Sequence, residues 1–179
     1  MLDNSTILWY NNNTKERRVQ KMKDLKEKAK VLVFDMDGVT VGLYNVENWL
    51  PMLRAENPLP YEIAKPLVDM AELRAVLMEL KKQGWHIAIT SWLSKGASFE
   101  YDNKVRQAKK NWLDKYNFPY DELHFLRYGT TKANATRAKG GYQILIDDNE
   151  KIRGGWRLGA TIDGTGNFIE ALKKLGKVD

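Results

Sequence analysis

Four aspartates in this sequence stand where two short apolar runs end. Asp35 and Asp37 follow the run VLVF two positions apart, and Gly38 comes next. Asp147 and Asp148 follow the run YQILI. Carboxylates gathered in this number would repel one another strongly unless a cation lay among them, and Mg²⁺ prefers oxygen ligands of this kind. The pattern therefore predicts a magnesium site, with Gly38 allowing the chain to turn sharply beside it.

Further polar residues follow the other apolar runs. Thr90 and Ser91 come after the run WHIAI, and Trp92 stands directly behind them. Lys132 follows the run LHFL and the turn RYGTT. Trp92 either stacks on a nucleobase or closes a hydrophobic seam beside the sheet.

Each of these residues also has a purely structural interpretation. Asp147 and Asp148 could cap the helix that follows them, since acidic residues favour a helix N-terminus. Thr90 could be an ordinary β-branched strand residue. Other lysines could take a functional role in place of Lys132, namely Lys95, Lys104 and Lys109. The functional interpretation is favoured because the two acidic pairs occur together in one chain.

Short apolar runs that alternate with amphipathic segments must position these residues. The sequence predicts strands at 31–34, 85–90, 123–126, 142–146 and 157–162. It predicts helices at 70–84, 100–117 and 167–176, and a short helical turn near 149–155. Continuous apolar strands separated by helices indicate a parallel sheet covered on both faces, which is an α/β fold of the doubly wound, Rossmann-like class. Such sheets bind ligands beyond the carboxyl ends of their strands, where the polar residues stand.

The order of these motifs resembles that of the haloacid dehalogenase (HAD) superfamily of phosphatases and phosphotransferases. VLVFDMDGV matches the first motif of that family, an apolar strand followed by Asp-x-Asp-Gly-Val. HIAIT, FLRYGTTK and ILIDD match the second, third and fourth motifs, which places Thr90 and Lys132 in the second and third. The resemblance covers residues 31 to about 175 and is closest to small phage-type members with little or no cap domain.

The resemblance implies a mechanism that passes through an aspartyl-phosphate. Asp35 would attack the phosphorus atom, and Asp37 would protonate the leaving oxygen and later deprotonate the attacking water. Thr90 and Lys132 would bind the phosphate oxygens, with Ser91 as a second donor.

The resemblance also implies a set of magnesium ligands. Asp35 and Asp148 would hold the ion through their carboxylates, and Asp37 through its backbone carbonyl. Asp147 would bind the ion directly or through a water molecule. The residues expected to contact the substrate are Ser91, Trp92 and Gly38.

Two segments outside the predicted sheet have their own interpretation. Residues 1–30 are expected to form an N-terminal arm and a basic amphipathic helix, and residues 31–179 the HAD-like α/β domain. The helix, at 14–30, is interpreted as a solvated helix beside the domain, with a nucleic-acid contact as the alternative. Residues 41–69 are too many for an ordinary loop and too few for a domain, so we expect a flap or mini-cap of one or two helices over a fairly open site.

Composition limits the classes of function. The chain has 179 residues, of which 43% are hydrophobic, and this suits a single domain with its own core. It contains no cysteine, which excludes a thiolate nucleophile, a disulfide framework and a cysteine-zinc site. No apolar run approaches the ~20 residues of a membrane span. The N-terminus lacks the features of a signal peptide, so a cytoplasmic location is expected.

Charge and motifs together favour an enzyme that acts on anionic substrates. The net charge of +6 favours anionic partners. We expect a magnesium-dependent phosphatase for a phosphorylated small molecule, with nucleotides favoured. One alternative is a phosphatase for nucleic-acid 3′ ends, which the positive charge and open site favour. The other is a binding or regulatory protein without catalysis, against which the intact acidic motifs argue. The sequence leaves the oligomeric state open.

Overall fold

The described part of the chain begins with the first strand of the sheet. The computed structural model describes residues 30–177. The basic helix expected at 14–30 therefore lies outside the described residues, apart from its last residue. That residue, Lys30, is the first residue of strand β1 and so belongs to the domain, one position earlier than the predicted boundary. Among the described helices, none is both long enough and apolar enough to cross a membrane.

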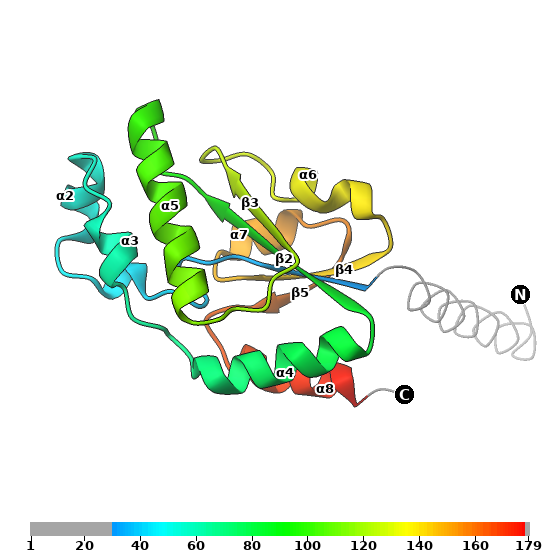
Figure 1. Cartoon of the computed structure of the whole chain (residues 1–179). Helices are drawn as coiled ribbons and strands as arrows, with labels where there is room; N and C mark the ends of the chain where they lie inside the picture. The colour runs from blue at the N-terminus through cyan, green and yellow to red at the C-terminus, as the bar shows by residue number, and fades with distance from the viewer. Residues whose placement is uncertain (1–29, 178–179) are drawn as a thin grey trace, which may run out of the picture.

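Five parallel strands form one sheet in the order β3-β2-β1-β4-β5 (Figure 1). They are β1 (Lys30–Phe34), β2 (Trp85–Trp92), β3 (Glu122–Leu126), β4 (Tyr142–Asp147) and β5 (Gly159–Asp163). The chain moves outward from β1 to β3 and then returns to the other side of β1 for β4 and β5. The predicted doubly wound, Rossmann-like α/β fold is thereby confirmed. The direction of winding reverses between β1 and β4, which is the place where such sheets bind ligands.

Helices cover both faces of the sheet. Alternate residues of β1 point to opposite faces, so that Leu32 and Phe34 enter the larger hydrophobic core and Val31 and Val33 the smaller one. The larger core lies under α4 (Met70–Lys82), α5 (Phe99–Lys115) and α8 (Phe168–Gly176). The smaller core lies under α6 (Ala133–Thr136) and α7 (Glu150–Gly155). In Figure 1, α4 and α8 run side by side along one edge of the molecule, away from α6.

Two predicted boundaries change in ways that affect the site. Strand β2 continues two residues past its predicted end at Thr90, because it pairs with β3 as far as the register Trp92↔Leu126. Ser91 and Trp92 therefore lie inside the strand and not after it. The short helix α6 and the 3-10 turn η2 (Arg137–Lys139) were not predicted, since four and three residues are too few to show helical periodicity.

The segment 41–69 folds over the carboxyl end of β1. It contains a 3-10 turn η1 (Leu43–Asn45) and two short helices, α2 (Trp49–Arg54) and α3 (Leu59–Ile63). Its function as a flap or mini-cap over a substrate stays a prediction. We call this segment the α2–α3 segment.

Hydrogen bonds fasten the α2–α3 segment to helix α5. Ser98, the N-cap residue of α5, donates from its backbone N and its hydroxyl to the two carboxylate oxygens of Glu56, each over 2.7 Å. The indole N–H of Trp112 donates to the backbone oxygen of Ala64 over 2.7 Å, and this bond is buried. Because these contacts join two points of the segment to one long helix, its position relative to the site is defined.

Candidate active site

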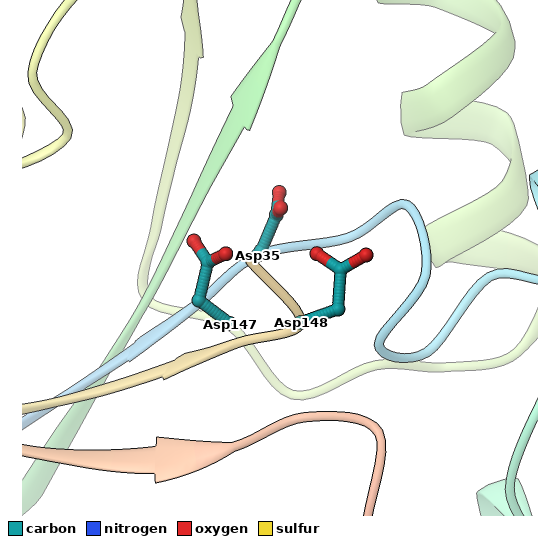
Figure 2. A group of neighbouring side chains, drawn as sticks. All are labelled: Asp35, Asp147 and Asp148. Carbon is teal, nitrogen blue, oxygen red and sulfur yellow. The ribbon is translucent and has the colours of Figure 1, made fainter. Parts of the chain in front are cut away.

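Three aspartates meet at the carboxyl ends of the two central strands. Phe34 pairs with Ile146 in the last register position of β1 and β4, and the backbone N of Asp35 donates to the backbone oxygen of Ile146 over 2.8 Å. Asp35 and Asp147 are thereby neighbours across the point where the winding reverses. One carboxylate oxygen from each of Asp35, Asp147 and Asp148 lies within 4.8 Å of the other two. Figure 2 shows the three side chains extending together from these two chain ends.

A buried lysine compensates part of this negative charge. The Nζ of Lys132 lies 2.6 Å from Oδ2 of Asp35 and 2.7 Å from Oδ2 of Asp147. Burial by itself lowers the pKa of Lys132, but the two carboxylates outweigh it and raise the pKa above its ordinary value. Three carboxylates and one ammonium sum to −3 + 1 = −2. This is the charge that one divalent cation would neutralise.

Asp148 is the carboxylate of this cluster for which no ion pair forms among the described residues. Burial raises its pKa to about 6, and the nearby charges of Asp35 and Asp147 act in the same direction. Burial likewise raises the pKa of Asp147, with Asp35 as the next cause, although Lys132 opposes the shift. These shifts come from burial first and from repulsion between the carboxylates second, and a cation bound at the cluster would oppose both.

The acidic pair does not cap the helix that follows it. The N-cap residue of α7 is Asn149, whose side-chain oxygen accepts hydrogen bonds from the backbone N atoms of Lys151 and Ile152. The one backbone group that donates to the Asp147 side chain among the described residues is the N of Asn149, over 2.9 Å. The structural alternative considered for Asp147 and Asp148 is therefore wrong, because a neighbouring residue does the capping.

Gly38 makes room for the cluster. Its φ of +81° lies in the region that favours glycine. A Cβ atom at this position would lie 2.4 Å from Oδ2 of Asp148 and 2.8 Å from the ring of Tyr44. Gly38 thus lets the loop after β1 approach Asp148, which makes it a packing requirement of the acidic cluster. Contact with a substrate stays a prediction for this residue.

Asp37 belongs to a second ion pair and not to the acidic cluster. Its Oδ2 accepts a hydrogen bond of 2.5 Å from the Nζ of Lys109. Its Oδ1 is enclosed and has no hydrogen-bond partner among the described residues. Burial raises the pKa of Asp37; Lys109 lowers it, and the charge of Asp35 raises it further. A carboxyl group with a raised pKa beside a nucleophile candidate is suited to carrying a proton.

The four candidate lysines occupy different places. Lys132 contacts Asp35, and its binding of phosphate oxygens stays a prediction. Lys104 pairs with Glu100 on the surface, and Lys95 lies at the rim of the cavity described below. Lys109 is fully buried, and its contact with Asp37 was not predicted. A sequence signal existed, because Lys109 falls four residues after Val105 on the apolar face of α5.

The predicted hydroxyl donors of β2 point to opposite faces of the sheet. Alternation along the strand places Thr90 with Ala88 on the side of the smaller core, and Ser91 with Ile89 on the side of the larger core. The hydroxyl of Thr90 is buried and has no partner among the described residues. The hydroxyl of Ser91 accepts a hydrogen bond from Lys109 over 2.8 Å. Thr90 is thus the free hydroxyl beside β1, whereas Ser91 supports Lys109.

A cavity of about 370 Å³ opens above Asp35 and Asp37. Two aromatic pairs form part of its wall. The rings of Tyr44 and Trp49 lie 5.1 Å apart in the α2–α3 segment, and the rings of Trp92 and Tyr128, from β2 and the loop after β3, lie 5.0 Å apart. The remaining lining residues include the cations Arg54 and Lys95. The cavity therefore combines flat apolar walls with positive charge above two carboxyl groups.

Comparisons with known proteins provide only a distant structural likeness. No family model matches the sequence, and no curated protein matches it. A solved structure of D,D-heptose 1,7-bisphosphate phosphatase from Burkholderia thailandensis is similar, with a TM-score of 0.43 and 14% sequence identity. The match covers 73% of this chain and 74% of that chain. A likeness at this level assigns no family to the chain.

Proposed function

We propose that the chain is a magnesium-dependent phosphomonoester hydrolase that works through an aspartyl-phosphate. The observation that carries this proposal is the position of Asp35. Its carboxylate lies against Lys132, within 4.8 Å of two further carboxylates, and at the floor of a cavity large enough for a small ligand. The proposal agrees with the resemblance of the sequence motifs to the HAD superfamily.

The donor set fits Mg²⁺. The carboxylates of Asp35 and Asp148 and the backbone carbonyl of Asp37 would hold the ion, with Asp147 binding directly or through water. The net charge of −2 and the absence of an ion pair for Asp148 among the described residues support this assignment. Bound there, the ion would offset the charge of the phosphate and polarise its oxygens.

Asp35 would be the nucleophile. One of its carboxylate oxygens would form a bond to phosphorus while the bond from phosphorus to the leaving oxygen breaks. The backbone N of Met36 donates to Oδ1 of Asp35 over 2.7 Å, and Lys132 holds Oδ2. Both oxygens are therefore held before a substrate arrives, which reduces the entropy lost on reaching the reactive geometry.

Asp37 would exchange the proton. Burial raises the pKa of its carboxyl group, and Asp37 lines the cavity in which the leaving oxygen would lie. The proton of this carboxyl group would pass to the leaving oxygen in the first step. In the second step a water molecule would attack phosphorus, give a proton back to the carboxylate of Asp37, and release inorganic phosphate and the carboxylate of Asp35.

Lys132 and Thr90 would bind the phosphate oxygens. An ammonium group has three N–H donors, and the carboxylates of Asp35 and Asp147 take two of those of Lys132. One donor remains for a phosphate oxygen. The unpartnered hydroxyl of Thr90 would supply a second hydrogen bond on the same side of the sheet. These donors would act where charge spreads over the phosphoryl oxygens in the transition state.

We further propose nucleotides or related phosphomonoesters as substrates. The two aromatic pairs of the cavity suit a flat base, which gains about 1–3 kcal/mol when it stacks on an aromatic side chain. Arg54 and Lys95 at the cavity favour anionic molecules. The same positive charge would also suit the 3′ end of a nucleic acid, which remains the alternative substrate.

The test is a panel of phosphomonoesters with the full chain in Mg²⁺ and in EDTA. The panel contains nucleoside monophosphates, ribose 5-phosphate and a 3′-phosphorylated oligonucleotide. We expect magnesium-dependent phosphate release, greatest for the nucleotides, and a loss of more than ~1000-fold in Asp35→Asn at unchanged thermal stability. Phosphate release by Asp35→Asn within a few fold of the wild type would remove Asp35 from the mechanism. Release from none of the substrates would favour the non-catalytic alternative.

A further inference from the structure

Lys109 is a fully buried lysine whose hydrogen bonds are all accounted for. Its Nζ donates to Oδ2 of Asp37 over 2.5 Å, to the hydroxyl of Ser91 over 2.8 Å and to the backbone oxygen of Trp92 over 2.8 Å. An ammonium group has three N–H donors, so none is left for a substrate. Burying a charged lysine costs several kcal/mol unless it is paired and hydrogen-bonded in this way.

The surroundings of Lys109 hold it in one place. It extends from the buried face of α5, between Val105 and Trp112 along the helix. Its Nζ lies 4.8 Å from the centre of the ring of Tyr61, in the α2–α3 segment, within the range of a cation-π interaction. The ammonium group is therefore held by β2, by the α2–α3 segment and by the loop after β1.

Asp37 has no other anchor among the described residues. Its Oδ1 has no hydrogen-bond partner there, and its Oδ2 is bound by Lys109 alone. The side chain is nevertheless part of the cavity wall. Without Lys109 no hydrogen bond from the described residues would fix the carboxyl group, and the direction of its proton transfer would no longer be defined.

We infer that Lys109 is a positioning residue that fixes the carboxyl group of Asp37 for transfer of a proton to the leaving oxygen. This inference rests on the proposed function. It assigns different tasks to the two buried lysines: Lys132 holds the nucleophile and the phosphate, whereas Lys109 acts only through Asp37. In the step concerned, the bond from phosphorus to the leaving oxygen breaks, its electron pair stays on that oxygen, and the proton of Asp37 neutralises it.

The inference predicts a loss that depends on the leaving group. An alkyl alcohol is a poor leaving group and requires the proton, whereas 2,4-dinitrophenolate is stable without one. A correctly placed general acid contributes about 10²–10⁴-fold. The ratio of kcat/KM for glycerol 2-phosphate to kcat/KM for 2,4-dinitrophenyl phosphate therefore reports the position of Asp37. A general disturbance of the site would lower both values and leave the ratio unchanged.

The test compares Lys109→Met with the wild type and with Lys110→Met, a matched control. Lys110 is the next residue of α5, but it lies on the surface and pairs with Asp114. We expect Lys109→Met to lower the ratio by ~100-fold, with less than ~3-fold loss for the dinitrophenyl ester. Lys110→Met should leave both values unchanged. Should Lys109→Met fail to fold, Ser91→Ala removes one acceptor of Lys109 and should lower the ratio by ~5-fold or more.

Two results would overturn the inference. One is an equal loss for both esters in the folded Lys109 or Ser91 variant, which would make Lys109 a structural residue only. The other is a folded Lys109 or Ser91 variant whose ratio of kcat/KM values and whose activity on both esters equal those of the wild type. A wild-type chain that releases phosphate neither from these two esters nor from any substrate of the panel in Mg²⁺ would overturn the proposed function itself, together with this inference, before any variant is compared.

Discussion

At the scale of single residues, Asp148 has a charge that the protein leaves without a partner among the described residues. The folded state raises its pKa from 3.8 to about 6. Between these values the folded chain binds a proton that the unfolded chain has lost, so the free energy of unfolding falls as the pH rises through this window. The raised pKa values of Asp37 and Asp147 act in the same direction. The metal-free protein should therefore lose stability between about pH 4 and 6.

Asp148→Asn tests directly whether the charge of Asp148 lowers the stability of the metal-free protein. Near neutral pH in EDTA, the substitution removes a charge that Asp35 and Asp147 repel, so the thermal midpoint should rise by ~2–4 °C, the shift expected for about 1 kcal/mol in a chain of this size. Thermal melts between pH 4 and 8 measure both the midpoint and its pH dependence. The control is Asp163→Asn, because hydrogen bonds from Thr165 lower the pKa of this exposed acid. An equal or lower midpoint for Asp148→Asn would show that repulsion in the cluster does not limit stability.

At the scale of elements, the two aromatic walls of the cavity come from different parts of the fold. Trp49 stands at the start of α2 beside Tyr44, and it also packs against the larger core. Trp92 is the last residue of β2, and its side chain is held by a hydrogen bond from its indole N–H to the backbone oxygen of Thr130 over 2.9 Å. Both side chains line the cavity in spite of these structural contacts. A base stacked between them would contact the α2–α3 segment on one side and strand β2 on the other.

Trp49→Ala and Trp92→Ala should each reduce the preference for a nucleotide. We expect kcat/KM for a nucleoside monophosphate, divided by kcat/KM for ribose 5-phosphate, to fall by ~5- to 100-fold, since each stack is worth about 1–3 kcal/mol. Phe99→Ala is the control, because Phe99 is 82% exposed at the start of α5 and does not line the cavity. The stacking hypothesis fails if the wild type gains nothing from the base, or if the preference survives both substitutions.

At the scale of the whole molecule, a bound cation would link the two halves of the sheet. Asp35 belongs to the half that runs from β1 to β3, and Asp147 and Asp148 belong to the half formed by β4 and β5. A ligand that binds only the folded state stabilises it by ~2.7 kcal/mol at a concentration 100 times its Kd. Magnesium should therefore stabilise the entire fold and not only the site.

Addition of millimolar Mg²⁺ to the metal-free chain should raise the thermal midpoint by several degrees, and Asp148→Asn should lose most of that increase. Scanning calorimetry with and without Mg²⁺ measures the shift, and it does not depend on any substrate. Lys110→Met, which leaves the acidic cluster intact, should keep the full increase. An identical increase in wild type and Asp148→Asn would place the ion elsewhere on the protein.

The sequence by itself determined the five strands, the longer helices and the order of the site residues. The apolar run of β1 is buried on both faces of the sheet, and a continuous apolar run of this kind can be recognised as a strand from the sequence. Because parallel strands end at the same edge, the acidic pairs at Asp35 and at Asp147 could be expected to meet from their positions in the chain alone. Lys132 was singled out by the resemblance of its motif, as a residue for phosphate binding, and its contact with Asp35 appears only in the structure.

The tertiary structure decided which groups contact one another, because those contacts join residues far apart in the chain. Asp37 and Lys109 are 72 positions apart, and nothing local distinguishes their pairing from one between Asp37 and another lysine. Helix α6 depends on packing against the smaller core, since its four residues are too few for a helix that is stable alone. Oδ1 of Asp37 is likewise enclosed without a hydrogen-bond partner among the described residues, and local sequence patterns do not encode that enclosure.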